Sequence, residues 1–173
     1  LALAFIGPGS DVLGFDTSRS MDHDWGPRVS VVVPSPEIDM VRRRFDELSD
    51  MLLPSEIAGF PTRVSWHPDD TAKLDATGSE HRVHITSVER LIQSTLSIDG
   101  LDRMNDAVWL STPMQSLLEI TAGEVFLDDT GELTDLRNKL AFYPDHILRF
   151  QLAGLWMRVS QVQPFIGRCF EVG

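Results

Sequence analysis

The chain concentrates strand patterns in its first half and helical periodicity in its second. Residues 1–6 form an uninterrupted apolar run that ends at Gly7-Pro8-Gly9-Ser10, which predicts a buried strand followed by a tight loop. Further strands are predicted over residues 25–33, 62–66 and 82–87. This order predicts an α+β fold in which a small mixed β-sheet, flanked by helices, is followed by a helical region.

A helix is predicted between the second and third strands. Ser35 suits the N-cap position, Pro36 suits the first turn, and Glu37 places a negative charge near the positive end of the helix dipole. Pro54 is expected to end this helix. Its apolar residues recur every three or four positions, at Ile38, Val41, Phe45, Leu48 and Leu52. We therefore expect one face of the helix to pack on the sheet.

Helical patterns dominate the chain after residue 88. Apolar spacing predicts helices over residues 88–96, 134–142 and 145–162, and residues 112–115 (Thr-Pro-Met-Gln) fit a capping box at the start of another helix. Residues 124–127 have an extended pattern and are followed by a predicted turn.

Two tryptophans in these helical patterns are expected in the core, Trp109 and Trp156. The last predicted helix also carries an apolar stripe on one face, formed by Leu148, Leu152, Leu155 and Val159. In the predicted turn, Asp128 and Asp129 precede Gly131 and are interpreted as turn chemistry.

The chain is strongly acidic. Its 173 residues include 15 Lys plus Arg and 26 Asp plus Glu, so that the net charge is 15 − 26 = −11. Such a charge repels phosphate backbones, which makes nucleic acid an unexpected partner, and it attracts cationic small molecules. The length fits one domain, or one domain plus a fragment.

The single cysteine, Cys169, cannot form an internal disulfide, and no stretch approaches the ~20 apolar residues that cross a bilayer. The chain begins without Met and lacks a signal-peptide pattern. We therefore expect a cytoplasmic protein without membrane contact, and a fragment that lacks part of its C-terminal region.

The residues best suited to chemistry lie between positions 9 and 28. Gly9 and Ser10 follow a predicted strand, so their turn can present backbone N–H groups to a phosphate. After an eleven-residue spacer, Asp22 and Asp24 stand at the head of the next strand, where residues two apart point to the same side. Paired carboxylates beside substrate phosphates suit Mg²⁺. The combination predicts a metal–nucleotide site.

Each of these features has a simpler interpretation when it is taken alone. An Asp-x-Asp pair is usually a solvated strand end, and Gly-Ser is usually an ordinary turn; their order and separation favour the functional interpretation. Residues 7–12 lack the third glycine of the dinucleotide fingerprint, and no Lys follows to make a Walker loop. For Arg28, contact with phosphate and an ordinary ion pair both stay open.

The string Gly9-Ser10, the spacer and Asp22-His23-Asp24 resembles the signature of the nucleotidyltransferase superfamily, the polymerase beta-like fold. Residues 9–15 and 22–28 resemble one branch of it, domain-of-unknown-function family 4037. Residues 118–126 and 163–169 are also similar to that branch, so the resemblance covers nearly the whole chain.

The resemblance implies a nucleotidyltransferase-like core over residues 1–100 and a helical region over 101–173 that shapes an acceptor pocket. Gly9-Ser10 would hold the terminal phosphates of a nucleoside triphosphate, with Arg28 as a further nucleotide-binding residue. The catalytic pair, Asp22 and Asp24, would bind Mg²⁺ (or Mn²⁺), which neutralises charge on the phosphorus under attack. The products would be a nucleotidylated acceptor and pyrophosphate.

Active members of the superfamily generally carry a third carboxylate on a neighbouring strand. The predicted strand 82–87 contains no acid; His84 points to the suitable face, and Glu80 and Glu89 flank the strand. Because His81 and His84 are three apart, they would face opposite sides of a strand, and a zinc pair is not expected.

Three functions are consistent with these observations. The first is transfer of a nucleoside monophosphate to a hydroxyl of a small molecule, with a cationic, aminoglycoside-like acceptor favoured by the acidic charge. The second is a nucleotide-binding module of the same fold that has lost turnover, as the missing third acid suggests. The third is a protein-modifying or toxin–antitoxin nucleotidyltransferase.

Overall fold

A four-stranded mixed sheet organises the fold. The computed structural model describes residues 1–14, 26–66 and 72–171. The sheet has the order β8-β2-β1-β9, with β1 at Ala2–Phe5, β2 at Val29–Val32, β8 at Val83–Thr86 and β9 at Glu124–Asp128. The mixed α/β architecture expected from the sequence is therefore confirmed at this level.

The pairing of the strands explains the connections between them. β2 pairs antiparallel with β1 and parallel with β8, and a parallel pair requires a long crossover, here through helix α1 (Ile38–Leu52). β9 pairs antiparallel with β1 on its other side. The extended pattern at 124–127 predicted this strand, but only the fold shows that it completes the sheet formed by strands from the first half of the chain.

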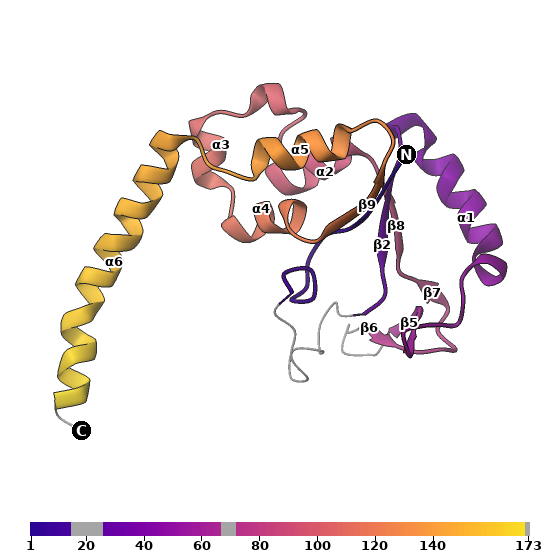
Figure 1. Cartoon of the computed structure of the whole chain (residues 1–173), viewed down its shortest axis with the longest axis horizontal. Coiled ribbons are helices and arrows are strands. Elements are labelled where there is room, and N and C mark those ends of the chain that lie inside the picture. Colours follow the sequence, from indigo (N-terminus) through magenta and orange to yellow (C-terminus); the bar gives the residue numbers. More distant parts are fainter. Residues whose placement is uncertain (15–25, 67–71, 172–173) are drawn as a thin grey trace.

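The two faces of the sheet are covered by different helices (Figure 1). α1 packs on one face through Ile38, which is buried with Val33 and Ile85. The other face carries the larger core, contributed by β1, β2 and the helices α2 (Val88–Leu96), α4 (Met114–Thr121) and α5 (Glu132–Leu140). The predicted apolar stripe of α1 is confirmed near its start, whereas Leu52 at its end is exposed.

Two small sheets form the rest of the β-structure in the described residues. One pairs β3 (Glu56–Ile57) with β4 (Phe60–Pro61). The other has the order β6-β5-β7, with β5 at Arg63–Trp66, β6 at Ala72–Leu74 and β7 at Glu80–His81. β7 precedes β8 directly, so this sheet lies at the end of the main sheet where β8 begins (Figure 1).

Two predicted helix caps are wrong, because their hydroxyls bond elsewhere. Ser35 opens a 3₁₀ turn, η1 (Ser35–Glu37), and its Oγ contacts Ser87 Oγ at 2.7 Å and donates to Glu89 Oε2 at 2.8 Å. Thr112 follows helix α3 (Asp106–Ser111), and its hydroxyl donates back to the carbonyl of Val108, so no capping box forms.

Other helix starts do have side-chain caps. Ser87 Oγ accepts from the N–H of Arg90 at the start of α2. Asn105 Oδ1 accepts from two backbone N–H groups at the start of α3. A short 3₁₀ turn, η2 (Leu101–Arg103), joins these two helices.

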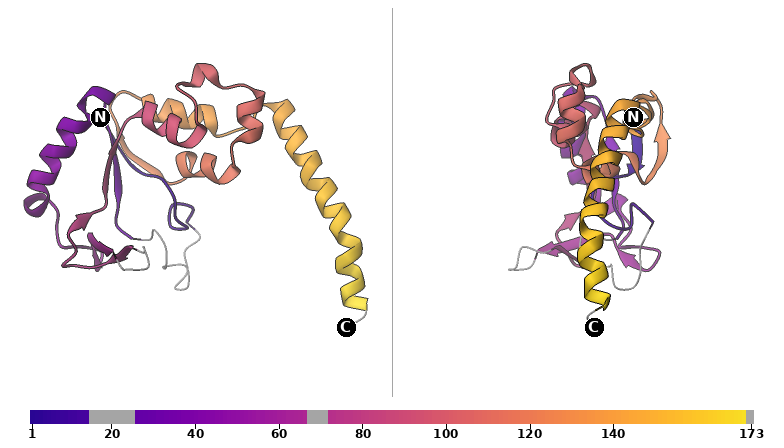
Figure 2. Two further views of the ribbon diagram at one scale, coloured as in Figure 1. Left: turned by 180° about the vertical axis from the view of Figure 1, so that it is seen from behind. Right: turned by 90° about the vertical axis from the view of Figure 1, so that its left-hand side faces the viewer.

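The last helix, α6 (Asp145–Glu171), is anchored by its first turn, where Ile147 is buried in the core, and then extends away from the sheet in Figure 1 and in the left-hand view of Figure 2. Trp109 on α3 is buried as expected, but the prediction of a core position for Trp156 is wrong, because 75% of its surface is exposed. Leu148, Leu152, Leu155 and Val159, predicted to share an apolar face, are also exposed.

The division of the chain at residue 100 stays a prediction. β9, which follows residue 100, pairs with β1, so the main sheet draws strands from both sides of the proposed boundary. Among the described residues, no helix is long and apolar enough to cross a membrane.

Candidate functional site

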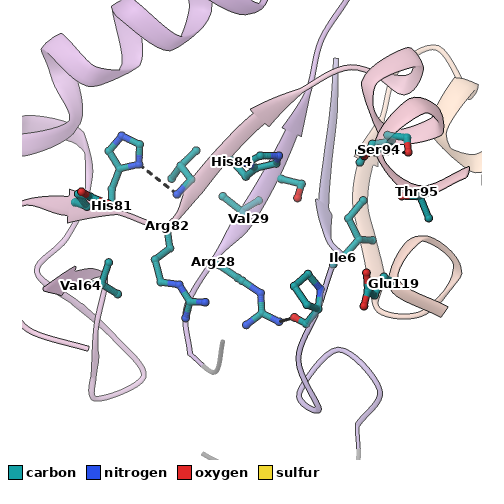
Figure 3. Close-up of a pocket in the computed structure, with 16 residues that line it drawn as sticks. Ile6, Arg28, Val29, Val64, His81, Arg82, His84, Ser94, Thr95 and Glu119 are labelled. Carbon is teal, nitrogen blue, oxygen red and sulfur yellow. Dashed lines mark hydrogen bonds between the residues drawn. The ribbon is translucent and has the colours of Figure 1, made fainter. Parts of the chain in front are cut away.

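A cavity with a volume of about 490 Å³ opens beside the main sheet (Figure 3). Its walls come from the end of β1 (residues 6–8), the start of β2 (28–30), the stretch from β7 into β8 (80–84), and helices α2 and α4. A cavity of this size suits a small-molecule ligand. The fold thus joins segments that are far apart in the sequence around one space.

The predicted Gly-Ser turn lies at one end of this cavity. Gly7 and Gly9 have φ angles of 112° and 119°, which side chains other than glycine rarely adopt. The N–H of Gly7 donates to the carbonyl of Glu119 on α4 at 2.8 Å, which anchors the turn to the helical side of the cavity. Gly7 and Pro8 line the cavity, and Gly9 and Ser10 continue the same turn.

An ion pair connects this turn to β2. Arg28 Nη1 donates to Asp11 Oδ2 at 2.8 Å, and Arg28 Nη2 donates to Asp11 Oδ1 at 2.7 Å and to the carbonyl of Pro8 at 2.6 Å. The guanidinium also lies over the ring of Phe5, 4.8 Å from its centroid. Arg28 and Asp11 are 12% and 11% exposed, so the pair is largely shielded from water.

Of the two possibilities for Arg28, the ion pair is therefore present, and contact with phosphate stays a prediction. Asp11 was missed as a site residue because nothing local in the sequence links it to an arginine 17 positions later. Its Oδ2 also accepts from the N–H of Gly26 at 3.2 Å. Asp11 thus ties the Gly-Ser turn to both Gly26 and Arg28.

A second arginine was also missed. Arg82 precedes β8, lines the cavity, and extends toward the same end of it as Arg28 (Figure 3). It reaches this place because β2 and β8 are parallel and adjacent, so that residues preceding the two strands meet at one sheet end; no local pattern in the sequence shows this pairing. Arg82 thus brings a second guanidinium group to the end of the cavity where Arg28 is paired with Asp11.

The catalytic and metal-binding pair expected from the sequence, Asp22 and Asp24, lies outside the described residues. Within the described part of the chain, no group of three or more His, Cys, Asp or Glu side chains could hold a metal ion. The proposed metal site thus stays a prediction.

The flanking acids proposed for the third carboxylate have different surroundings. Glu80 lines the cavity. Glu89 accepts from Ser35 and borders a separate cavity of about 220 Å³ at another edge of the sheet. The hydrogen bond from Ser35, followed by bonds from its own backbone and Ser87, lowers the pKa of Glu89 and keeps it ionised.

Two histidines line the cavity, with different partners. His81 Nε2 lies 3.0 Å from Asp46 Oδ1, and its Nδ1 accepts from the N–H of Val83 at 3.3 Å. His84 stands opposite Ser30 in the register of the parallel strands. Its pKa is lowered, first by partial burial in the cavity wall and then by the charge of Arg42.

Comparison with known proteins gives one match. The family model of a domain of unknown function, DUF4037, matches residues 109–173, from α3 to the end of the chain. This part of the chain, which contains Glu119 and β9, is similar to that family. No curated protein and no solved structure matches the chain.

Proposed function

We propose that the cavity binds a nucleoside triphosphate with Mg²⁺ (or Mn²⁺), and that the protein transfers the nucleoside monophosphate to a hydroxyl of a small molecule. The observation that carries the proposal is the meeting of Gly7 and Pro8, which lead into the Gly-Ser turn, with Arg28 and Arg82 at one end of a cavity of about 490 Å³. A triphosphate is the anion for which such an end is suited, because guanidinium groups bind phosphate.

The Asp11 connections support this assignment. They hold the Gly-Ser turn next to Gly26, and Asp22 and Asp24 precede Gly26 by four and two residues in the sequence. In the proposal these carboxylates hold the metal, which supplies charge neutralisation at the reacting phosphorus when it is bound. Arg28 and Asp11 keep the turn in place, and Arg82 binds phosphate oxygens.

The acceptor is proposed to enter from the helical side. Ser94 and Thr95 on α2 and Glu119 on α4 line the cavity there, across from the arginines (Figure 3). Hydroxyl and carboxylate groups suit an acceptor that carries hydroxyls and positive charge, in agreement with the net charge of −11. Nucleic acid is not proposed as an acceptor. Because nucleoside triphosphates are abundant in the cytoplasm, we propose that the protein acts there.

A second candidate, nucleotide binding without turnover, is favoured by the side chains of β8. None of the four residues of this strand, Val-His-Ile-Thr, is an acid. A site of this kind would bind the metal–nucleotide complex and release no pyrophosphate. A protein side chain as acceptor is the remaining alternative from the sequence.

Calorimetric titration of Mg-ATP into the protein tests the proposal. We expect saturable binding that depends on the divalent ion, and a loss of affinity of about tenfold or more in the double variant Asp22→Asn/Asp24→Asn, equivalent to about 1.4 kcal/mol. Pyrophosphate release with pooled hydroxyl acceptors then separates transfer from binding alone.

The matched control is Asp102→Asn/Asp129→Asn, which removes the same charge at positions 80% and 57% exposed and outside the cavity lining. It should bind Mg-ATP like the unmodified protein. Unchanged affinity in the Asp22/Asp24 variant, or no binding by the unmodified protein, would refute the proposed function. Labelling of lysate proteins by tagged ATP would point to a protein acceptor.

A further inference from the structure

Transfer to a hydroxyl requires a group that removes its proton. The described titratable side chains that line the cavity, besides the two arginines, are Glu80, His81, His84 and Glu119. A proton acceptor must be unprotonated near neutral pH, must have a free lone pair, and must reach the ligand space.

The other three groups are less suited to this role. Both ring nitrogens of His81 are used, one by Asp46 and one by the backbone of Val83. Glu80 interacts with another group of the protein. Glu119 accepts from Gln115 Nε2 at 3.4 Å, and it lies on α4, across the cavity from the arginines of the proposed phosphate end (Figure 3).

His84 meets the geometric requirements. It lies on the edge strand β8 with its side chain exposed toward the cavity, next to Ser30 on the central strand β2 (Figure 3). Among the residues that the structure describes, no hydrogen-bond partner occupies either of its ring nitrogens. One nitrogen of the neutral ring therefore keeps a lone pair available to a ligand.

The surroundings also keep this ring neutral. Partial burial disfavours the imidazolium, and Arg42 on α1, whose guanidinium donates to the carbonyl of Ile85, adds a repelling positive charge; together they lower the pKa of His84 below 6.5. The other charged groups that line the cavity are Arg82, the ion-paired Arg28, and the carboxylates Glu80 and Glu119.

We propose that His84 is the general base that accepts the proton of the attacking hydroxyl, in place of the third carboxylate. This inference rests on the proposed function. The acceptor oxygen forms a bond to the α-phosphorus, the bond from that phosphorus to the pyrophosphate oxygen breaks with its electron pair, and the hydroxyl proton moves to His84. Pyrophosphate leaves with the negative charge, and the imidazolium later returns its proton to water.

The pH profile of pyrophosphate release tests this role, with Mg-ATP and the acceptor pool described above. In the unmodified protein the rate should rise with pH through the pKa of His84, below 6.5, and then level off. His84→Gln should lose this rise and lower the rate by about 10² to 10⁴-fold, as is typical for removal of a general base. Its affinity for Mg-ATP should stay the same, which also shows that the variant is folded.

Two further measurements test the role of His84 without relying on the His84→Gln variant alone. Added imidazole should restore part of the rate of His84→Ala, which a purely structural role of His84 would not allow. In the unmodified protein, the NMR signals of the His84 ring should titrate below pH 6.5. The control His146→Gln changes a histidine on α6 that is 63% exposed, and it should keep the rate and the profile.

The outcomes separate the two proposals. A His84→Gln variant with an unchanged rate and profile, or a ring that titrates above 6.5, would overturn the role of His84 and leave nucleotide transfer standing. Binding of Mg-ATP without pyrophosphate release for any acceptor would overturn both transfer and this role, in favour of the binding module. Absence of Mg-ATP binding would reject the proposed function itself.

Discussion

At the scale of single residues, the bidentate pair between Arg28 and Asp11 is the contact on which the candidate site depends most. It is largely buried, and it ties the turn after β1 to the start of β2. Removing one partner of a buried pair leaves the other charge without compensation, which costs more than the pair itself contributes.

We therefore expect Asp11→Asn to lower the free energy of unfolding by about 3 kcal/mol. Arg28→Lys should also destabilise the protein, because a lysine ammonium cannot reproduce both hydrogen bonds and the contact with Phe5. Urea denaturation measures both effects. Asp50→Asn, which breaks an ion pair at a carboxylate that is 95% exposed, is the control and should change stability by less than about 1 kcal/mol. Equal effects of the two Asp→Asn changes would contradict this assignment.

At the scale of elements, a single carboxylate connects β9 to α5. Asp128 accepts from the N–H of Gly131 at 3.0 Å and from the N–H and hydroxyl of Thr134, both at 2.8 Å. Burial alone raises the pKa of Asp128, but the hydrogen bonds from Thr134 and Gly131 outweigh it, so its pKa is lowered. The predicted turn chemistry is thus confirmed for Asp128, and the residue also caps the helix that follows.

Because the pKa of Asp128 is lower in the folded state than its unfolded value of 3.8, the ionised carboxylate stabilises the folded protein above that pH. This stabilisation is lost as the pH falls through the pKa of the folded state. We expect Asp128→Ala to cost about 1 kcal/mol at neutral pH, as loss of a helix cap does. The difference from the unmodified protein should shrink below about pH 4, as denaturation at several pH values would show. A difference that persists at low pH would contradict the role of the charge; Asp129→Ala is the neighbouring control.

At the scale of the whole molecule, the core and the middle of α6 are distinct environments, although Ile147 in the first turn of α6 is buried in the core. Trp109 is 7% exposed and packs at 5.3 Å against Tyr143, whereas Trp156 projects from α6 at 75% exposure. Trp109→Ala should therefore cost about 3 to 5 kcal/mol. Trp156→Ala should change stability by less than about 0.5 kcal/mol. Thermal or urea unfolding compares the two, and similar losses would show that α6 is packed in solution.

The periodicity of apolar residues predicted secondary structure correctly where residues close in the sequence share one buried face. The strands at 2–5, 29–32 and 83–86 and helix α1 follow from local patterns, because alternation and three-to-four spacing report burial directly. The hydrogen-bond partners of the Ser35 and Thr112 hydroxyls could not be predicted, because several groups nearby compete for them and the folded structure determines which one is in reach. The predicted core position of Trp156 was wrong for a related reason: an apolar pattern on one helix does not show whether another part of the protein covers it.

Local patterns account for the main strands and most of the helices, for the acidic charge and for the Gly-Ser turn, because each depends on composition or on residues close along the chain. Long-range packing accounts for the place of β9 in the sheet, for the pairing of Asp11 with Arg28, and for the cavity that Arg82 and His84 share with Gly7 and Pro8. These contacts join residues 17 or more positions apart, and their formation depends on how strands pair and helices pack, which no local pattern encodes.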